Sequence, residues 1–138
     1  MAEAFFNTAA ILTEGLEDWF ASSAGIYAYE GTKASRPAVK VMDADYGIDI
    51  SQHTSRMVSE ELIAATEIVL CMTPEHRDII VSLYPEYFDK VHTLKRYVDK
   101  HVKSEGITDP YGSYDEAYSE CAKEIKENTD KLILMLAR

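Results

Sequence analysis

One stretch constrains the fold of this chain more than any other. Residues 67–72, with the sequence Glu-Ile-Val-Leu-Cys-Met, form an almost continuous apolar run, and Thr73-Pro74 follows directly. Such a run is typical of a parallel β-strand that is buried on both faces. Thr at a cap position with Pro at the first helical position is a typical helix start. A buried strand that leads straight into a helix predicts an α/β fold.

The rest of the chain alternates between strand and helix patterns in the same way. Further strands are expected over residues 19–24 and 90–94. Helices are expected over residues 2–16, from the cap Ser35 to Gly47, from the cap Ser59, from Thr73 to Pro85, and over about 114–137. Strands that alternate with helices indicate a single α/β domain over residues 1–138, built as a three-layer parallel sheet with flanking helices.

Charge and composition exclude several classes of protein. The 138 residues are 46% hydrophobic and 28% charged, with a net charge of −10 and no long basic stripe, so nucleic acid is not an expected partner. No apolar stretch reaches the length of a membrane span, and the first residues lack the basic start of a signal peptide. The two cysteines offer neither a disulfide framework nor a metal-binding spacing. We expect a soluble, cytoplasmic protein without a metal site.

A short loop before the last helix presents an acid. In Asp109-Pro110-Tyr111-Gly112, Pro110 keeps the preceding Asp109 out of helical angles and Gly112 marks a turn. Ser113 and Glu116 have the spacing of a capping box, which predicts the start of the closing helix. An acid held on a rigid loop in front of a helix is a candidate catalytic or binding group. The alternative is an ordinary turn, because Asp-Pro pairs are common there.

Cys71 and Arg77 have the spacing of a different catalytic site. A thiolate and an arginine separated by five residues between a strand and a helix could attack phosphorus and bind its oxygens. However, the intervening loop contains no glycine, Pro74 removes an N–H donor, and Glu75 would repel a phosphate. We therefore expect Cys71 to be a small buried apolar side chain rather than a nucleophile.

Six short stretches are specific as an ordered set. They are Met1-Ala2-Glu3-Ala4-Phe5-Phe6, Ser23-Ala24-Gly25, Gly47-Ile48-Asp49 leading to His53, Leu70-Cys71-Met72-Thr73, Lys90-Val91-His92-Thr93-Leu94-Lys95-Arg96-Tyr97-Val98, and Asp109-Pro110-Tyr111-Gly112. This set spans nearly the whole chain and resembles the low-molecular-weight protein tyrosine phosphatases, especially the bacterial branch that contains protein-arginine phosphatases.

The resemblance implies a fold, an activity and a set of site residues. The fold would be phosphotyrosine phosphatase-like, and the activity would be hydrolysis of phosphotyrosine or phosphoarginine on proteins through a cysteinyl-phosphate intermediate. Asp109 would be the general acid, and Tyr111 would line the mouth of the substrate pocket. Ser23 and His53 would brace the catalytic loop from behind. A phosphorylated protein would be the partner, and neither a metal nor another cofactor would be needed.

One part of the family pattern has no counterpart in the 138 residues. In the family, Met-Ala-Glu-Ala follows a catalytic Cys-x5-Arg-Ser loop, whereas here it opens the sequence. We therefore expect an N-terminally truncated domain that lacks its first central strand and is inactive, for example through a start codon assigned too far downstream. The alternative is a non-catalytic phosphatase-like binding or regulatory module. Tyrosine versus arginine specificity and the oligomeric state stay open.

Overall fold

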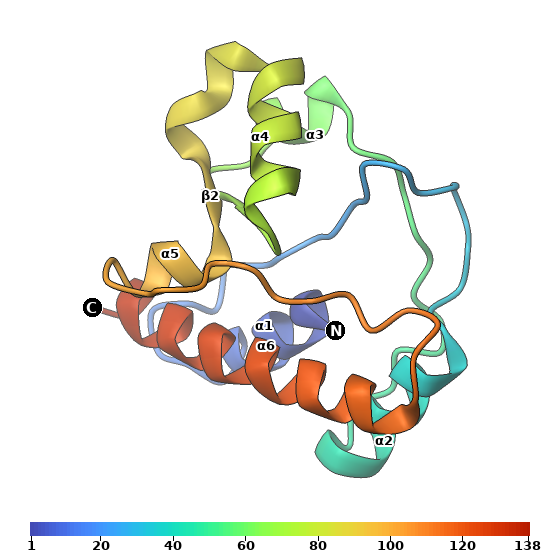
Figure 1. Cartoon of the computed structure of the whole chain (residues 1–138). Helices are drawn as coiled ribbons and strands as arrows, with labels where there is room; N and C mark the ends of the chain where they lie inside the picture. The colour runs from blue at the N-terminus through green and yellow to red at the C-terminus, as the bar shows by residue number, and fades with distance from the viewer.

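The computed structural model describes residues 1–138, in which short strands alternate with helices (Figure 1). The two strands are β1 (Val69–Cys71) and β2 (Val91–Thr93). The helices are α1 (Ala2–Ala10), α2 (Arg36–Tyr46), α3 (Glu60–Ala65), α4 (Pro74–Leu83), the 3₁₀ helix η1 (Pro85–Lys90), α5 (Leu94–Val98) and α6 (Asp115–Leu136). No helix is both long enough and apolar enough to cross a membrane.

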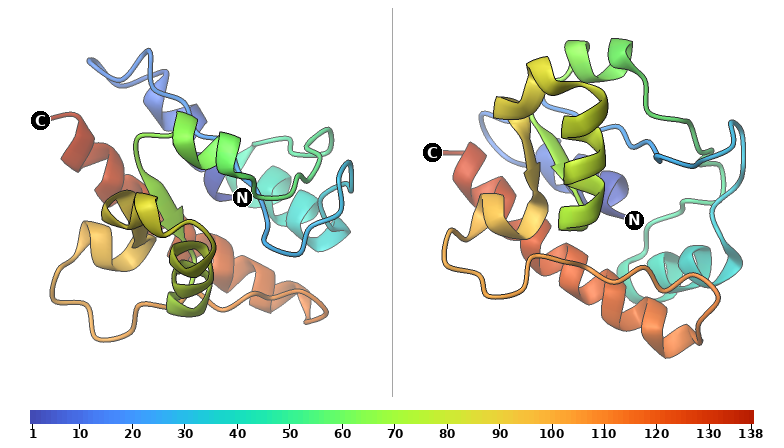
Figure 2. Two further views of the ribbon diagram at one scale, coloured as in Figure 1. Left: turned by 90° about the horizontal axis from the view of Figure 1, so that it is seen from above. Right: turned by 45° about the horizontal axis from the view of Figure 1, so that its top comes forward.

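The sheet lies between two groups of helices. β1 and β2 pair in parallel with Leu70 opposite His92, and α4 and η1 make the crossover between them. Figure 1 shows α4 on one side of this pair and α5 and α6 on the other, and Figure 2 shows the same order from two further directions. The two strands predicted at 67–72 and 90–94 are therefore confirmed, as is the α/β fold with a parallel sheet.

Local sequence signals set the helix boundaries. Ser59 Oγ accepts a hydrogen bond of 3.2 Å from the Leu62 N–H and so caps α3. Thr73 Oγ1 does the same for the His76 N–H at the start of α4, also at 3.2 Å. α2 ends at Gly47, whose φ of 65° is the left-handed conformation that glycine adopts without strain. These three predicted boundaries are confirmed.

The strand expected over residues 19–24 is wrong. This segment pairs with no other strand, and only the adjacent Gly25 forms an isolated parallel bridge, with Met57. A side chain takes the place of a strand partner here. The carboxamide of Asn7 donates to the Ala21 carbonyl at 2.9 Å and accepts from the Ala21 N–H at 2.6 Å. No ladder forms along this segment.

Two helix predictions also need correction. The helix expected over 2–16 ends at Ala10, and turns follow, with Gly15 at a φ of 88°. Leu12 is 83% exposed, whereas Leu16 returns to the core through these turns. Residues 94–98, expected to lie at a strand end and in a loop, form α5, because the side chain of Thr93 caps the Arg96 N–H.

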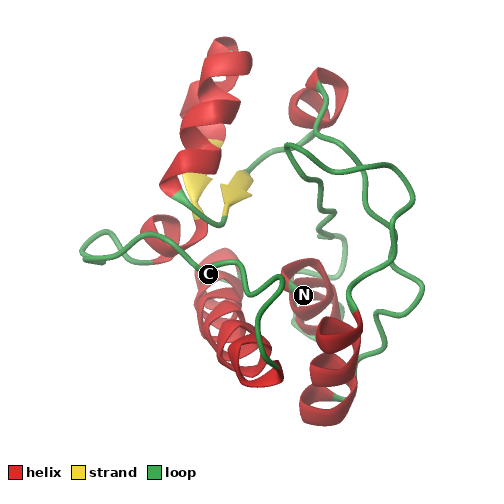
Figure 3. Cartoon of the chain, turned by 45° about the vertical axis from the view of Figure 1, so that its right-hand side comes forward, coloured by secondary structure: helices red, strands yellow, loops and turns green.

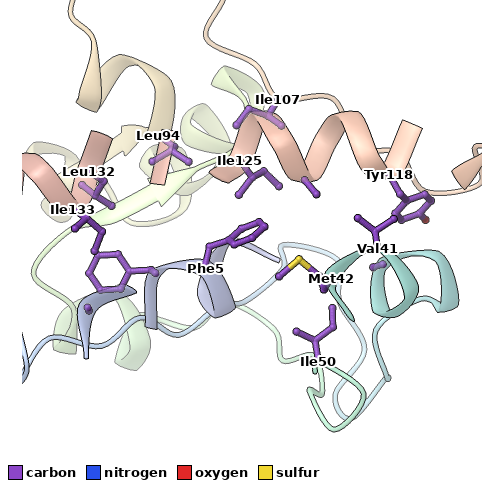
Figure 4. Packing of buried hydrophobic residues seen from close by; sticks show 14 of the residues in the cluster. Phe5, Val41, Met42, Ile50, Leu94, Ile107, Tyr118, Ile125, Leu132 and Ile133 are labelled. Atoms are coloured by element: carbon purple, nitrogen blue, oxygen red, sulfur yellow. The ribbon is translucent and has the colours of Figure 1, made fainter. Parts of the chain in front are cut away.

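Two hydrophobic clusters hold the fold together. The larger one packs α1, α2 and α6 against each other, with Phe5, Met42 and Ile125 near its centre (Figure 4). The smaller one joins β1 and β2 to α3 and α4 through Ile63, Cys71, Ile80 and Val91. Figure 3 shows the long loops, in green, that link these two regions. The loops between the clusters carry the candidate site.

Candidate functional site

A cavity of about 650 Å³ opens where the start of α1 meets the loops before α2 and before α6. Its hydrophobic wall includes Ala38, Ile50 and Tyr118. It is also lined by three carboxyl groups, two amines and an imidazole, from Glu3, Asp49, Asp109, Met1, Lys33 and His53. Such a mixture of an apolar wall and a few convergent polar groups is typical of a binding or active site.

Asp109 and Tyr111 line this cavity from the loop that precedes α6. Asp109 Oδ1 accepts a hydrogen bond of 3.0 Å from the Tyr111 N–H, which fixes one carboxylate oxygen against its own loop. Tyr111 is 80% exposed and lies at the rim. The two site residues predicted from the sequence therefore line the same pocket.

The loop after Asp109 is held by a turn rather than by the expected capping box. Ser113 donates its N–H to the Pro110 carbonyl at 2.8 Å, and Gly112, with a φ of 80°, supplies the left-handed residue of the turn. Because the Ser113 N–H is already bonded, it cannot serve Glu116. α6 starts at Asp115 with Tyr114 as its N-cap residue and no side-chain cap. The predicted Ser113–Glu116 box is wrong.

Ser23 and His53 meet at a third residue, Glu3. Ser23 Oγ donates to Glu3 Oε1 at 3.1 Å, and His53 Nδ1 lies 3.3 Å from Glu3 Oε2. His53 lines the cavity, while Ser23 lies behind Glu3. This carboxylate therefore joins the first turn of α1 to segments 20 and 50 residues further along the chain.

The segment that leads to Asp109 is anchored at two points. The Ile107 N–H bonds to the Met72 carbonyl at 2.8 Å, directly after β1, and the Ile107 side chain is only 3% exposed. Two residues earlier, Glu105 Oε1 accepts from Arg96 Nε at 3.2 Å, and from Thr93 Oγ1 at 3.1 Å. The hydrogen bond from Arg96, followed by that from Thr93, lowers the pKa of Glu105 despite partial burial. The acid-bearing loop is thus tied to both strands.

The structure does not combine Cys71 and Arg77 into a second site. Burial raises the pKa of the Cys71 thiol to about 11, although the charge of Arg77 acts in the opposite direction. Arg77 lies on the first turn of α4 and pairs with Asp78 at 3.1 Å and with Glu105 at 3.5 Å. A neutral thiol beside an arginine that is already paired is a poor nucleophilic site. The prediction that Cys71 is a buried structural residue agrees with this arrangement.

The other cysteine lies closer to the acid but is no better activated. Burial and the neighbouring Asp109 carboxylate both raise the pKa of Cys121 on α6. Neither cysteine lines the cavity, and no arginine lines it either. In addition, no group of three or more His, Cys, Asp or Glu side chains is arranged to hold a metal ion. The cavity therefore offers an acid and a hydrogen-bonded wall, but no thiol of its own.

Sequence reasoning missed several residues that shape this cavity. Lys33 and Asp49 line it, and Glu3 is the centre of its braced wall. No spacing rule connects Glu3 to Ser23 or His53. The only available signal was the position of Glu3 inside a stretch that carries the family resemblance.

Comparison with known proteins gives a consistent result. Residues 1–138 match the family model described as low molecular weight phosphotyrosine protein phosphatase. The chain is 36% identical over 139 residues to a protein-arginine-phosphatase of Bacillus subtilis, with 100% of the chain and 88% of the relative covered.

Solved structures agree with the sequence match. A low molecular weight protein tyrosine phosphatase from T. tengcongensis is 41% identical, with a TM-score of 0.87 over 97% of this chain and 88% of that one. A Cys-to-Ser variant of the arginine phosphatase YwlE, with a phosphorylated active-site serine, is 34% identical, with a TM-score of 0.89 over 98% of this chain and 85% of that one. The chain therefore belongs to the low-molecular-weight phosphotyrosine protein phosphatase family.

Proposed function

We propose that the cavity is the general-acid side of a phosphatase site that acts on phosphorylated side chains of proteins. The observation that carries the proposal is the position of Asp109, which lines the pocket on a loop anchored to both strands. Family membership supports the same reaction class. The rim residue Tyr111 would pack against the side chain that carries the phosphoryl group.

In this mechanism Asp109 acts twice. A cysteine thiolate attacks phosphorus and forms an S–P bond while the bond to the leaving oxygen or nitrogen breaks. The protonated Asp109 gives its proton to that leaving atom. The resulting carboxylate then takes a proton from a water molecule that attacks phosphorus, which releases phosphate and the thiolate. The phosphorylated serine that replaces a cysteine in the YwlE variant supports a covalent intermediate of this kind.

The braced wall has a different role in the proposal. We do not assign Glu3, Ser23 or His53 to proton transfer to the leaving group. The Ser23–Glu3 hydrogen bond and the His53–Glu3 contact hold the start of α1 against the cavity, and we assign these three residues to positioning the catalytic loop rather than to chemistry. Any loop that brings a nucleophile to Asp109 would rest on this wall.

We further propose that the 138 residues do not turn over substrate by themselves, because neither cysteine lines the cavity and the Cys71 thiol has a pKa of about 11. The same observation supports a second candidate function, a phosphatase-like module that binds a partner through the pocket without catalysis. Both phosphotyrosine and phosphoarginine are candidate substrate groups, since relatives of similar identity are named for each.

A chimera tests the proposal. The strand and Cys-x5-Arg-Ser loop of the Bacillus subtilis relative would be joined ahead of Met1, and hydrolysis of p-nitrophenyl phosphate and of a phosphoarginine peptide would be measured. We expect turnover by the chimera and none by the 138 residues alone. A folded chimera without turnover would favour the binding module. Turnover by the 138 residues that is lost in Cys71→Ser would contradict our assignment of the site.

A further inference from the structure

One carboxylate upstream of Asp109 collects several hydrogen-bond donors. Glu105 lies four residues before Asp109 in the chain, and its side chain is only 19% exposed. Its Oε1 accepts hydrogen bonds from Thr93 Oγ1 at 3.1 Å and from Arg96 Nε at 3.2 Å, and Arg77 Nη1 lies 3.5 Å away. Three donors therefore converge on a single oxygen of Glu105, whereas an ordinary surface ion pair has one.

These donors come from the carboxyl ends of both strands. Thr93 is the last residue of β2, Arg96 lies in α5 directly after it, and Arg77 lies in the first turn of α4, which follows β1. Thr93 is 1% exposed, and its Oγ1 also accepts the Arg96 N–H at 3.3 Å. In open parallel sheets, ligands bind outside the carboxyl ends of the strands. Glu105 thus ties the acid loop to the edge of the sheet at which a site is expected.

A second fixed point lies between Glu105 and Asp109. The Ile107 N–H bonds to the Met72 carbonyl at 2.8 Å, and the Ile107 side chain is 3% exposed. Two residues further along, the Cα of Asp109 can lie at most about 7 Å from that of Ile107. One fixed point limits this distance but leaves the direction of the chain open. Because Glu105 is held as well, the segment cannot pivot about Ile107, and the direction is set too.

Beyond Asp109 the loop has few contacts with the rest of the protein. Pro110 is buried but has no N–H to donate, and residues 111–116 are all exposed. The ion pair of this stretch joins Asp115 to Lys40 at 2.8 Å, with side chains that are 58% and 70% exposed. Exposed ion pairs of this kind contribute little. The orientation of Asp109 therefore depends mainly on the residues that precede it.

We propose that Glu105 is a positioning residue for Asp109, which it holds at the distance from the leaving atom that proton transfer needs. This inference rests on the proposed function, in which Asp109 is the general acid. Glu105 does not line the cavity, so it acts through the loop rather than on the substrate. A general acid must lie within about 2.6–3.2 Å of the atom that it protonates. A misplacement of about 1 Å can lower the rate by about 10²-fold.

The first test needs no catalysis and uses the full 138-residue chain. Backbone ¹⁵N relaxation gives the order parameters of the Thr108, Asp109 and Tyr111 amides. We expect each of them to fall by at least about 0.2 in Glu105→Ala, because the segment can then pivot about Ile107. If the order parameters and the chemical shifts of these amides both stayed unchanged, the proposal would be overturned.

Two further variants show whether the effect belongs to the Glu105 contacts. Asp130→Asn is the control, because it removes a carboxylate that pairs with Lys126 at 2.8 Å within α6, and it should leave the loop amides unchanged. Glu105→Gln keeps an acceptor oxygen for Arg96 and should recover part of the order lost in Glu105→Ala. An equal loss of order in Asp130→Asn would overturn the proposal. If Glu105→Ala does not fold, Glu105→Gln takes its place with the same expected direction.

The second test is a double-mutant cycle in the active chimera. Glu105→Ala should lower kcat/KM by about tenfold or more for phenyl phosphate, and by less than about twofold for a fluorinated aryl phosphate, whose leaving group needs no proton. In an Asp109→Asn background, Glu105→Ala should cause no further loss, because no acid remains to be positioned. A purely structural role would lower kcat/KM for both substrates and in both backgrounds, and that result would overturn the proposal.

The two ideas fail in different ways. A folded chimera with Glu105 intact and no turnover would count against the proposed function, while the order parameters would still decide whether Glu105 holds the loop. An active chimera whose kcat/KM for phenyl phosphate is unchanged by Glu105→Ala would overturn the positioning role alone.

Discussion

Oε2 of Glu3 lies 3.3 Å from Nδ1 of His53, so that a contact across 50 residues of sequence forms one wall of the cavity. The other oxygen of Glu3 accepts a hydrogen bond from Ser23. Glu3 belongs to the first turn of α1, where a carboxylate is also favourable against the helix macrodipole. The wall therefore depends on a single side chain.

Replacing Glu3 should weaken the fold by breaking both contacts. We expect Glu3→Ala to lower the free energy of unfolding by about 1–2 kcal/mol, even though alanine is the better helix former. Urea unfolding followed by circular dichroism measures the change. Glu14→Ala is the control, because Glu14 is exposed, and it should change stability by less than about 0.5 kcal/mol. Equal effects of the two substitutions would show that the Glu3 contacts do not matter.

Glu105 should make stability depend on pH. The hydrogen bond from Arg96 lowers the pKa of Glu105 below its ordinary value of 4.5, so its stabilising contribution is fully present above that value and is lost as the pH falls through the lowered pKa. We expect Glu105→Gln to be less stable than the unchanged protein at pH 7, with the difference shrinking below about pH 4.

Two measurements check this prediction. Urea midpoints between pH 7 and pH 3 give the stability difference, with Glu127→Gln, an exposed change on α6, as the matched control. Trypsin cleavage at Lys100 and Lys103 should also be faster in Glu105→Gln, because the loop loses its anchor on Arg96 and Thr93. A constant stability difference across this pH range would contradict the role given to the carboxylate.

The thiol of Cys71 should be nearly inert in the folded protein. With a pKa of about 11, its thiolate fraction at pH 8 is about a hundredfold smaller than that of a thiol with the ordinary value. In a Cys121→Ser background, labelling of Cys71 with iodoacetamide should be slower than labelling of the urea-unfolded chain by at least this factor. If labelling of Cys71 were fast and inorganic phosphate slowed it, the prediction would be contradicted, and Cys71 and Arg77 would be a candidate catalytic pair again.

Sequence patterns predicted the fold well where one signal dominates. The apolar run of residues 67–72 predicted β1, and Thr73-Pro74 predicted the start of α4, because an apolar run and capping chemistry are local signals in the sequence. The strand predicted over residues 19–24 is wrong. The local sequence does not reveal that the side chain of Asn7, rather than a neighbouring strand, hydrogen-bonds the backbone of Ala21. The five-residue helix α5 is too short to show a periodicity.

The site was predictable only in part. Pro110 and Gly112 mark the turn that presents Asp109, and these are signals in the local sequence. Ser23 and His53 were chosen through the family resemblance alone, and the structure places both on Glu3. The meeting of these three side chains is a product of tertiary packing, so no spacing in the sequence could reveal it.

The leaving-group dependence of catalysis tests the central assignment, Asp109 as the general acid. In the chimera described above, Asp109→Asn should lower kcat/KM, which reports the step in which the leaving group departs, by about 10²–10⁴-fold for phenyl phosphate, whose leaving group needs a proton. The loss should be much smaller for a fluorinated aryl phosphate, whose leaving group departs without one. An Asp109→Asn variant with unchanged kcat/KM for both substrates, or with an equal loss of kcat/KM for both, would contradict the assignment.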